Sequence, residues 1–247
     1  MKKHVFANQV NQDFALRIQK IRHLRLSTFI LYLYALFPLA AISQHTCGQA
    51  DVMDLWFKKH PEQKIAFEEA QLKKAAQLRQ AAATQVSSTP SYTIPVVFHI
   101  LHLGGAENIS DAQVIDQVAL LNRDYQKQNA DTAAVVSTFT NNIANVGFSF
   151  KLATIDPDGN CTNGIVRHYT AKTNWDANDL NQFVYTWPPD KYLNFYIVKS
   201  INIQATAYTF LPGIGIPTNA DAIVCLHQVC GSIGTGIPAN SRTLTHE

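Results

Sequence analysis

The last two residues of the chain, His246 and Glu247, are of the types that zinc chemistry needs. They close the segment Ser241-Arg-Thr-Leu-Thr-His-Glu247, which predicts the first turns of a helix. In the motif His-Glu-x-x-His, two histidines one helical turn apart bind the metal, and the glutamate takes a proton from metal-bound water. Only the first half of that motif is present. A His-Glu pair also occurs on solvated helix faces without any chemical role, so the remaining segments have to decide between the two readings.

The amino-terminal residues predict export. An uncharged apolar run, Leu26 to Ala41, follows a basic segment and ends near the small residues Ala41 and Ser43. This pattern is typical of a secretory signal peptide covering residues 1–43. A membrane anchor is disfavoured, because the run is shorter than the ~20 residues that span a bilayer and Pro38 interrupts it. We therefore expect a secreted protein with no stable membrane anchor after signal cleavage.

The formal net charge of +2 comes from that leader. Without residues 1–43 the chain has 14 basic and 17 acidic residues. No basic stripe remains that could follow a phosphate backbone, so a nucleic-acid partner is not expected.

Four cysteines, at positions 47, 161, 225 and 230, are disulfide candidates in an exported protein. Three pairings are open, and the sequence does not choose among them. The segment Cys225-x-His227-x-x-Cys230 contains three possible metal ligands in six residues, but this spacing matches no common zinc pattern. A local disulfide or a pair of buried thiols is the favoured reading of Cys225 and Cys230.

Residues 44–90 form a separate polar segment. Pro61-Glu62 is a good helix start, and residues 68–83 are rich in strong helix formers. The apolar stripe of this helix, Ile65, Leu72 and Ala76, is thin, so we expect it to pack on another surface. Residues 87–90 (Ser-Ser-Thr-Pro) predict a linker.

Residues 91–247 predict an α+β domain with a twisted mixed sheet and two packed helices. The apolar run 94–101 predicts an interior strand, and alternating or apolar runs predict further strands at 148–155, 192–198 and 222–226. A capping box, Ser110-Asp-Ala-Gln113, begins a helix over 110–127 whose apolar face is Val114, Val118, Leu121 and Tyr125. The glycine-rich loops 211–217 and 231–238 lack the spacing of phosphate-binding loops. His99 and His102 lie three apart on a strand and face opposite sides, so we interpret them as core or surface histidines.

Several short segments, in their shared order, resemble the pappalysin-type metallopeptidases, a branch of the metzincins. They are Ile94-Pro-Val-Val-Phe-His-Ile-Leu-His102, Asn108-Ile-Ser-Asp-Ala-Gln113, Leu121-Asn-Arg-Asp-Tyr125, Asp156-Pro-Asp-Gly159, Thr162-Asn-Gly-Ile-Val-Arg167, Tyr192-Leu-Asn194 and Arg242-Thr-Leu-Thr-His-Glu247. The resemblance covers about residues 92–247, and the helical segment before it resembles the propeptide of the family.

The resemblance implies a secreted zinc metalloendopeptidase whose upper subdomain is the predicted sheet with its two helices. His246 would be the first Zn²⁺ ligand and Glu247 the general base. Cys47, followed by a glycine, would be a zymogen cysteine that binds the zinc; a disulfide cysteine or a lipidated cysteine are its alternatives. A peptide or protein substrate would lie antiparallel to an edge strand near Ala222 to His227.

The sequence departs from the family pattern at its end, where the second and third histidines and the lower subdomain are missing. We interpret this as an interrupted coding sequence or a fragment. By itself the chain is expected to be marginally stable, to hold zinc weakly and to cleave no peptides. The alternative function is an exported, non-catalytic protein-binding domain that has lost its zinc site.

Overall fold

The computed structural model describes residues 47–81 and 91–247. The predicted signal peptide (1–43) and linker (87–90) lie outside the described residues. No helix in the described ranges is long and apolar enough to cross a membrane.

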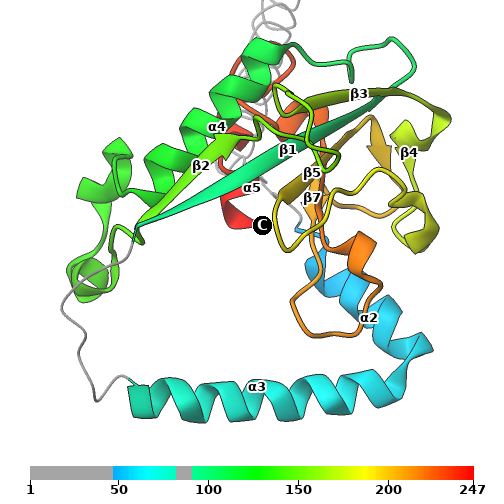
Figure 1. Ribbon diagram of the computed structural model, residues 1–247. Helices are drawn as coiled ribbons and strands as arrows, with labels where there is room; N and C mark the ends of the chain where they lie inside the picture. The colour runs from blue at the N-terminus through cyan, green and yellow to red at the C-terminus, as the bar shows by residue number, and fades with distance from the viewer. Residues whose placement is uncertain (1–46, 82–90) are drawn as a thin grey trace, which may run out of the picture. The chain divides into compact units, whose positions relative to one another are not determined.

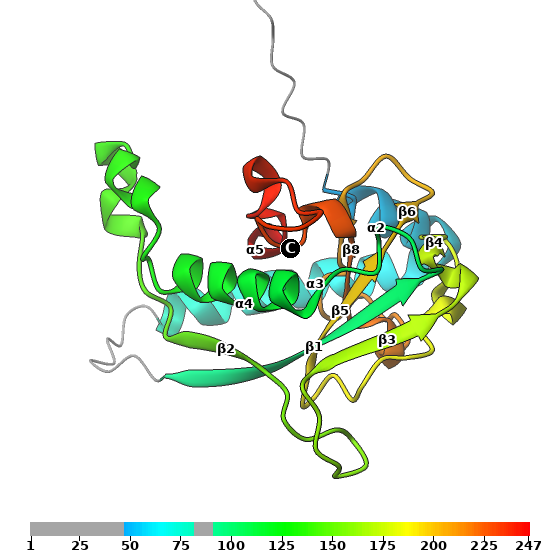
Figure 2. The same ribbon diagram turned by 90° about the horizontal axis from the view of Figure 1, so that it is seen from above.

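The domain is organised around the long strand β1 (Tyr92–His102), whose residues 96–101 are completely buried. On one side, β2 (Phe148–Leu152) pairs with the first half of β1 and β3 (Ile165–Tyr169) with its second half, both parallel (Figure 2). On the other side lie β5 (Leu193–Val198) and then β8 (Ile223–Leu226), also parallel. The short strand β7 (Ala207–Tyr208) completes the sheet in the antiparallel direction. The predicted mixed sheet is therefore confirmed.

The sheet separates two hydrophobic cores, because successive side chains of a strand point to opposite faces. Phe195 and Ile197 of β5 belong to the core under helix α4 (Asp111–Tyr125), whereas Tyr196 and Val198 belong to the opposite core. Figure 1 shows α4 running along the sheet. Half of the predicted capping box is present, since the Ser110 hydroxyl accepts a hydrogen bond from the Gln113 N–H. The Gln113 side chain does not complete the box, because it donates to the His227 and Cys230 carbonyls instead.

The remaining described elements are short or lie in the segment before the sheet. They are α2 (Gln49–Lys59), α3 (Pro61–Ala81), α5 (Thr243–His246), the strand pair β4 (Asn174–Trp175) and β6 (Ser200–Ile201), and the 3-10 helices Ala130–Ala134, Ser137–Asn142, Ala171–Thr173, Leu180–Gln182, Thr218–Ala220, His227–Val229 and Pro238–Asn240. The sequence did not predict α2, β3 or β7.

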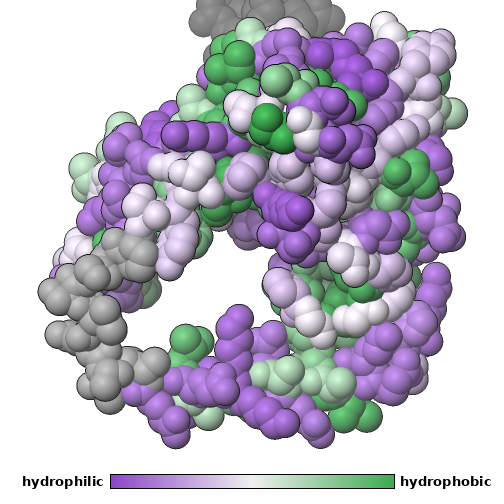
Figure 3. Space-filling view, viewed as in Figure 1, coloured by the Kyte–Doolittle hydropathy of each residue, from purple (hydrophilic) through white to green (hydrophobic). Residues whose placement is uncertain are grey.

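Helix α3 begins at Pro61 as predicted, but the prediction for its apolar stripe was wrong. Ile65 and Leu72 are exposed, and Figure 3 shows a mostly hydrophilic surface along this helix. An alanine-rich helix can form through intrinsic propensity without burying a face. Helix α2 is the one that docks instead: Val52 is buried, and the Trp56 indole N–H donates to the Ile214 carbonyl at 3.0 Å.

All four cysteines are free thiols, so the expectation of disulfides is not met. Cys161 is exposed in the turn after β2, and Cys47 lies beside Glu247. Cys225 and Cys230 are completely buried in the core under α4, where they pack as small apolar residues. The alternative of two buried thiols therefore describes this pair.

Candidate metal centre

The predicted helix at the end of the chain is present as α5, a single turn that places His246 and Glu247 side by side. Leu244 anchors it, because its side chain is buried in the core under α4. The Arg242 side chain makes no capping hydrogen bond to the backbone at the start of this helix. The two chemically interesting residues therefore project from a short element that is held by its neighbours.

Cys47 reaches the same place from the opposite end of the chain. Its backbone forms a parallel bridge with Ala207 of β7, and the Gly48 N–H donates to the Ala207 carbonyl at 2.8 Å. A side chain at position 48 would place its Cβ 2.7 Å from the Ala205 Cβ. Glycine is thus needed for this close approach, and the approach brings the Cys47 thiol beside α5.

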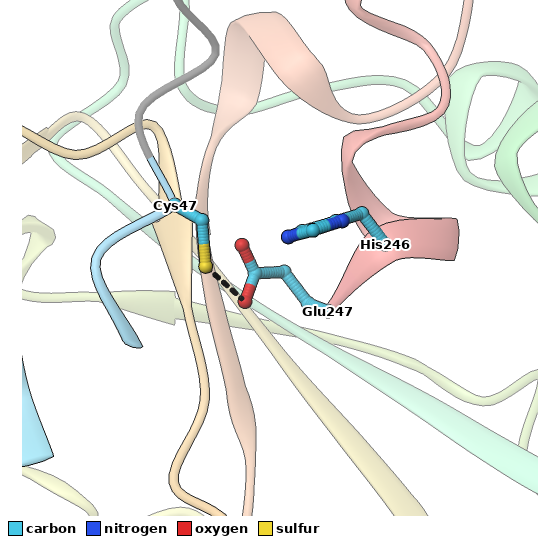
Figure 4. Close-up of side chains that lie close together, drawn as sticks. All are labelled: Cys47, His246 and Glu247. Carbon is cyan, nitrogen blue, oxygen red and sulfur yellow. Dashed lines mark hydrogen bonds between the residues drawn. The ribbon is translucent and has the colours of Figure 1, made fainter. Parts of the chain in front are cut away.

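The three side chains converge on one point (Figure 4). The Cys47 thiol donates to Glu247 Oε2, with Sγ and Oε2 3.5 Å apart. One ligand atom from each of Cys47, His246 and Glu247 lies within 4.8 Å of the other two. In the described part of the chain this is the one group of three or more His, Cys, Asp or Glu residues with such spacing. A cavity of about 200 Å³ adjoins them, lined also by Thr206, Ala239, Arg242 and Thr243.

The electrostatics of this group follow from its burial. Burial raises the pKa of the Cys47 thiol, and the negative charge of Glu247 adds to the increase. Burial likewise raises the pKa of Glu247, although the hydrogen bond from Cys47 and the charge of His246 partly oppose the rise. A carboxylate whose pKa is raised in this way binds a proton more readily, as a general base must.

These residues fit a zinc ion by two criteria. Thiolate sulfur and imidazole nitrogen are ligand atoms that zinc takes in proteins, and a carboxylate beside the metal can take a proton from metal-bound water. In addition, Glu247 Oε1 is buried without a hydrogen-bond partner among the described residues. Because a buried carboxylate oxygen without a partner is costly and Glu247 lines this cavity, the site suits a bound group that can donate a hydrogen bond to Oε1.

The other candidate positions do not join this centre. The His227 ring contacts the Thr235 hydroxyl at 2.9 Å, and burial of the ring lowers its pKa. His99 and His102 point to different surroundings, as predicted, and His99 contacts His168 instead. The expected edge strand near Ala222 to His227 was wrong, because β8 is paired on both sides, by β5 and by β7.

The sequence did not indicate two further side chains at or behind this centre, Thr206 and Asp124. The Thr206 hydroxyl is buried without a partner among the described residues and lines the same cavity. Asp124 accepts hydrogen bonds from Arg242, the residue just before α5, and from Thr245 within α5. Asp124 does lie in the segment Leu121-Asn-Arg-Asp-Tyr125, but no local pattern indicates its partners more than 110 residues away.

Comparison with solved structures identifies the class of the fold. Mature mirolysin from Tannerella forsythia, in complex with a cleaved peptide, is 33% identical over 66% of this chain and 62% of its own length, with a TM-score of 0.58. A promirolysin mutant from the same organism is 27% identical over 81% of this chain and 65% of its own length, with a TM-score of 0.62. The fold is metzincin-like.

Mirolysin is a metzincin-type zinc metallopeptidase, and mirolysin in complex with a small compound matches this chain equally well, at 32% identity and a TM-score of 0.57. The chain spans less than two thirds of the length of each of these structures. No protein-family model and no curated protein matches it.

Proposed function

We propose that this chain is part of the zymogen of a secreted zinc-dependent metalloendopeptidase, with His246 as a zinc ligand and Glu247 as the general base. The observation that carries the proposal is the convergence of Cys47, His246 and Glu247, whose ligand atoms lie within 4.8 Å of one another although 200 positions separate Cys47 from Glu247. The likeness to mirolysin supports the same class of enzyme.

Each side chain has a distinct role in this proposal. His246 presents an imidazole nitrogen to the cavity, and further ligands would follow it along the helix in the complete motif. When bound, zinc would polarise the substrate carbonyl and make a water molecule acidic enough to lose a proton near neutral pH. Glu247 accepts that proton, and the raised pKa of its carboxyl group lets it hold the proton and pass it to the leaving amine.

Cys47 would keep the enzyme silent. Its thiol donates a hydrogen bond to the Glu247 carboxylate and so occupies the position from which a water molecule would donate to this base. As a thiolate, the same sulfur would take the zinc position that water needs. Residues 44–90 would then be a propeptide, and the promirolysin structure supports this, since it covers 81% of the chain whereas mature mirolysin covers 66%.

The substrate would be an extended peptide along β7. This strand is the sheet edge beside the site, and its Ala207 carbonyl already accepts a main-chain hydrogen bond from Gly48. An exposed edge binds peptides through such bonds. The propeptide segment therefore occupies the edge that a substrate needs, which adds a second obstacle to catalysis. Export through a signal peptide at residues 1–43 completes the proposal.

The test compares the 247-residue chain with a longer protein that continues through the rest of the zinc motif. The 247-residue chain should bind zinc weakly in isothermal titration and cleave no peptides. The longer protein should bind zinc tightly and cleave peptides once the propeptide is removed. Glu247→Gln in the longer protein should abolish cleavage and leave zinc bound, because the glutamate is a base and not a ligand.

The proposed inhibition by Cys47 is tested with a pair of cysteine variants. Cys47→Ser should raise the peptide cleavage rate of the unprocessed longer protein, whereas Cys161→Ser, which changes an exposed thiol outside the Cys47–His246–Glu247 group, should leave it unchanged. Chelator-sensitive proteolysis by the 247-residue chain, or full activity after Glu247→Gln, would contradict the assigned roles. A longer protein that binds peptides but no zinc would establish the alternative, a non-catalytic binding domain.

A further inference from the structure

Helix α5 cannot fix the direction of His246 and Glu247 by itself. It contains four residues, and so short a helix is not stable in isolation. The conformational entropy lost in forming the first turn exceeds the free energy gained from its hydrogen bonds. Its start also lacks a side-chain cap from Arg242. Contacts from other elements must therefore set both its position and its rotation about its own axis.

Asp124, in the last turn of α4, supplies two of these contacts. Its side chain is only 1% exposed. One carboxylate oxygen, Oδ2, accepts from the Thr245 hydroxyl at 2.9 Å and from Arg242 Nε at 3.2 Å. The other oxygen, Oδ1, accepts from Arg123 at 3.4 Å. Arg242 is held from its far side by an ion pair with Asp131.

The two bonds to Oδ2 constrain α5 in different ways. Arg242 is the residue just before the helix, so its ion pair fixes where the helix begins. Thr245 is the residue before His246, and successive helical side chains are about 100° apart around the axis. Holding the Thr245 hydroxyl against α4 therefore turns His246 and Glu247 away from α4, toward Cys47.

We infer that Asp124 is a positioning residue, which sets the location and rotation of α5 and so directs His246 and Glu247 into the metal centre. Its importance for catalysis rests on the proposed function. The placement of α5 does not, because the contact between Cys47 and Glu247 reports that placement without any metal.

The experiment measures how fast iodoacetamide alkylates Cys47 in the metal-free 247-residue chain, by mass spectrometry of the peptide that contains it. Thr245→Val removes the hydroxyl and keeps the side-chain shape, whereas Thr245→Ser keeps the hydroxyl. A hydrogen bond to a charged group is strong enough that its loss should raise the alkylation rate roughly tenfold in the valine variant. The serine variant should react at the original rate.

Asp124→Asn should raise the rate at least as much, and the double variant with Thr245→Val should react no faster than Asp124→Asn alone, because both changes break one network. Asp111→Asn is the control. It removes another Asp–Arg pair, the 2.7 Å contact with Arg167 at the opposite end of α4, and should leave Cys47 alkylation unchanged.

An unchanged rate in the valine variant, additive effects in the double variant, or an equal effect of Asp111→Asn would each overturn the inference. If Asp124→Asn fails to fold, the threonine pair still decides the question. Zinc titration of the longer protein separates this inference from the proposed function. Asp124-dependent alkylation in a protein that binds no zinc would refute only the function, and tight zinc binding with Asp124-independent alkylation would refute only the positioning role.

Discussion

A pair of histidines inside the sheet should make the fold sensitive to acid. His99 on β1 is completely buried, and its Nε2 lies 3.1 Å from Asn194 Oδ1. The Asn194 amide nitrogen donates to the Trp187 and Tyr192 carbonyls, so Oδ1 is the acceptor and His99 Nε2 carries the proton. The neutral ring must then accept at Nδ1, which lies 3.3 Å from His168 Nε2.

Protonation of His99 would put a second N–H against the one that His168 donates. Within the described part of the chain, the groups around this ring are His168, Asn194, Tyr196 and Trp187, with His102 beyond His168, and none of them is acidic. Burial is the main cause that lowers the pKa of His99 from 6.5 to about 4, and the charge of His168 adds to it. The pKa of His168 is lowered to about 4 as well, mainly by burial.

The sign of the effect follows from these directions. A histidine with a lowered pKa in the folded state binds its proton more readily in the unfolded chain, so stability is full above pH 6.5 and falls toward pH 4. For His99 alone, a pKa of about 4 against 6.5 gives a loss of about 2 kcal/mol at pH 5. The calculation includes one proton for His99 and His168 together, because the two rings share a hydrogen bond and the His168 ring is partly solvated.

The assay is thermal unfolding followed by circular dichroism at pH 7 and pH 5. For a domain of this size, a loss of about 2 kcal/mol corresponds to a fall of about 4–8 °C in the midpoint. His99→Gln should remove most of this pH dependence. His227→Gln, which changes another histidine with a pKa lowered by burial, should leave most of it in place. A midpoint that differs by less than about 2 °C between the two pH values, or an equal fall in the His99→Gln variant, would refute the reasoning.

Two further predictions concern the docked segment. Trp56→Ala removes a half-buried ring and its hydrogen bond to the Ile214 carbonyl, so α2 should open more easily by about 2 kcal/mol, roughly half the loss for a fully buried aromatic ring. Hydrogen exchange of the α2 amides should then accelerate about 30-fold, with the exposed Leu72→Ala as a neutral control; unchanged exchange would contradict the docking. Gly48→Ala should displace residues 47–48 from β7, because its Cβ would meet the Ala205 Cβ at 2.7 Å. Limited proteolysis should cut the variant near α2 faster than the parent, and equal rates would show that the close approach at Gly48 is dispensable.

The sequence alone determined the elements whose burial repeats with a local period. The apolar run at 94–101 predicted β1, and the spacing of Val114, Val118 and Leu121 predicted α4. Residues that contact the core recur every second position in a strand and every third or fourth position in a helix. Short elements such as β7 contain too few residues to show any period. Helix α2 was missed although Val52, Met53, Trp56 and Phe57 recur at helical spacing and pack on one core, because no side-chain cap marks its start at Gly48.

The sequence also singled out Cys47, His246 and Glu247 as separate candidates through a family resemblance. Only the tertiary structure brought the thiol to the carboxylate, because that contact depends on β7 being the sheet edge and on Gly48 fitting against it. The same holds for Asp124 with Thr245 and for His99 with His168, which are 121 and 69 positions apart. Local sequence patterns show which face of its own helix or strand a residue lies on. Contacts between residues far apart in the sequence depend instead on the order of the strands and on how the helices pack across them.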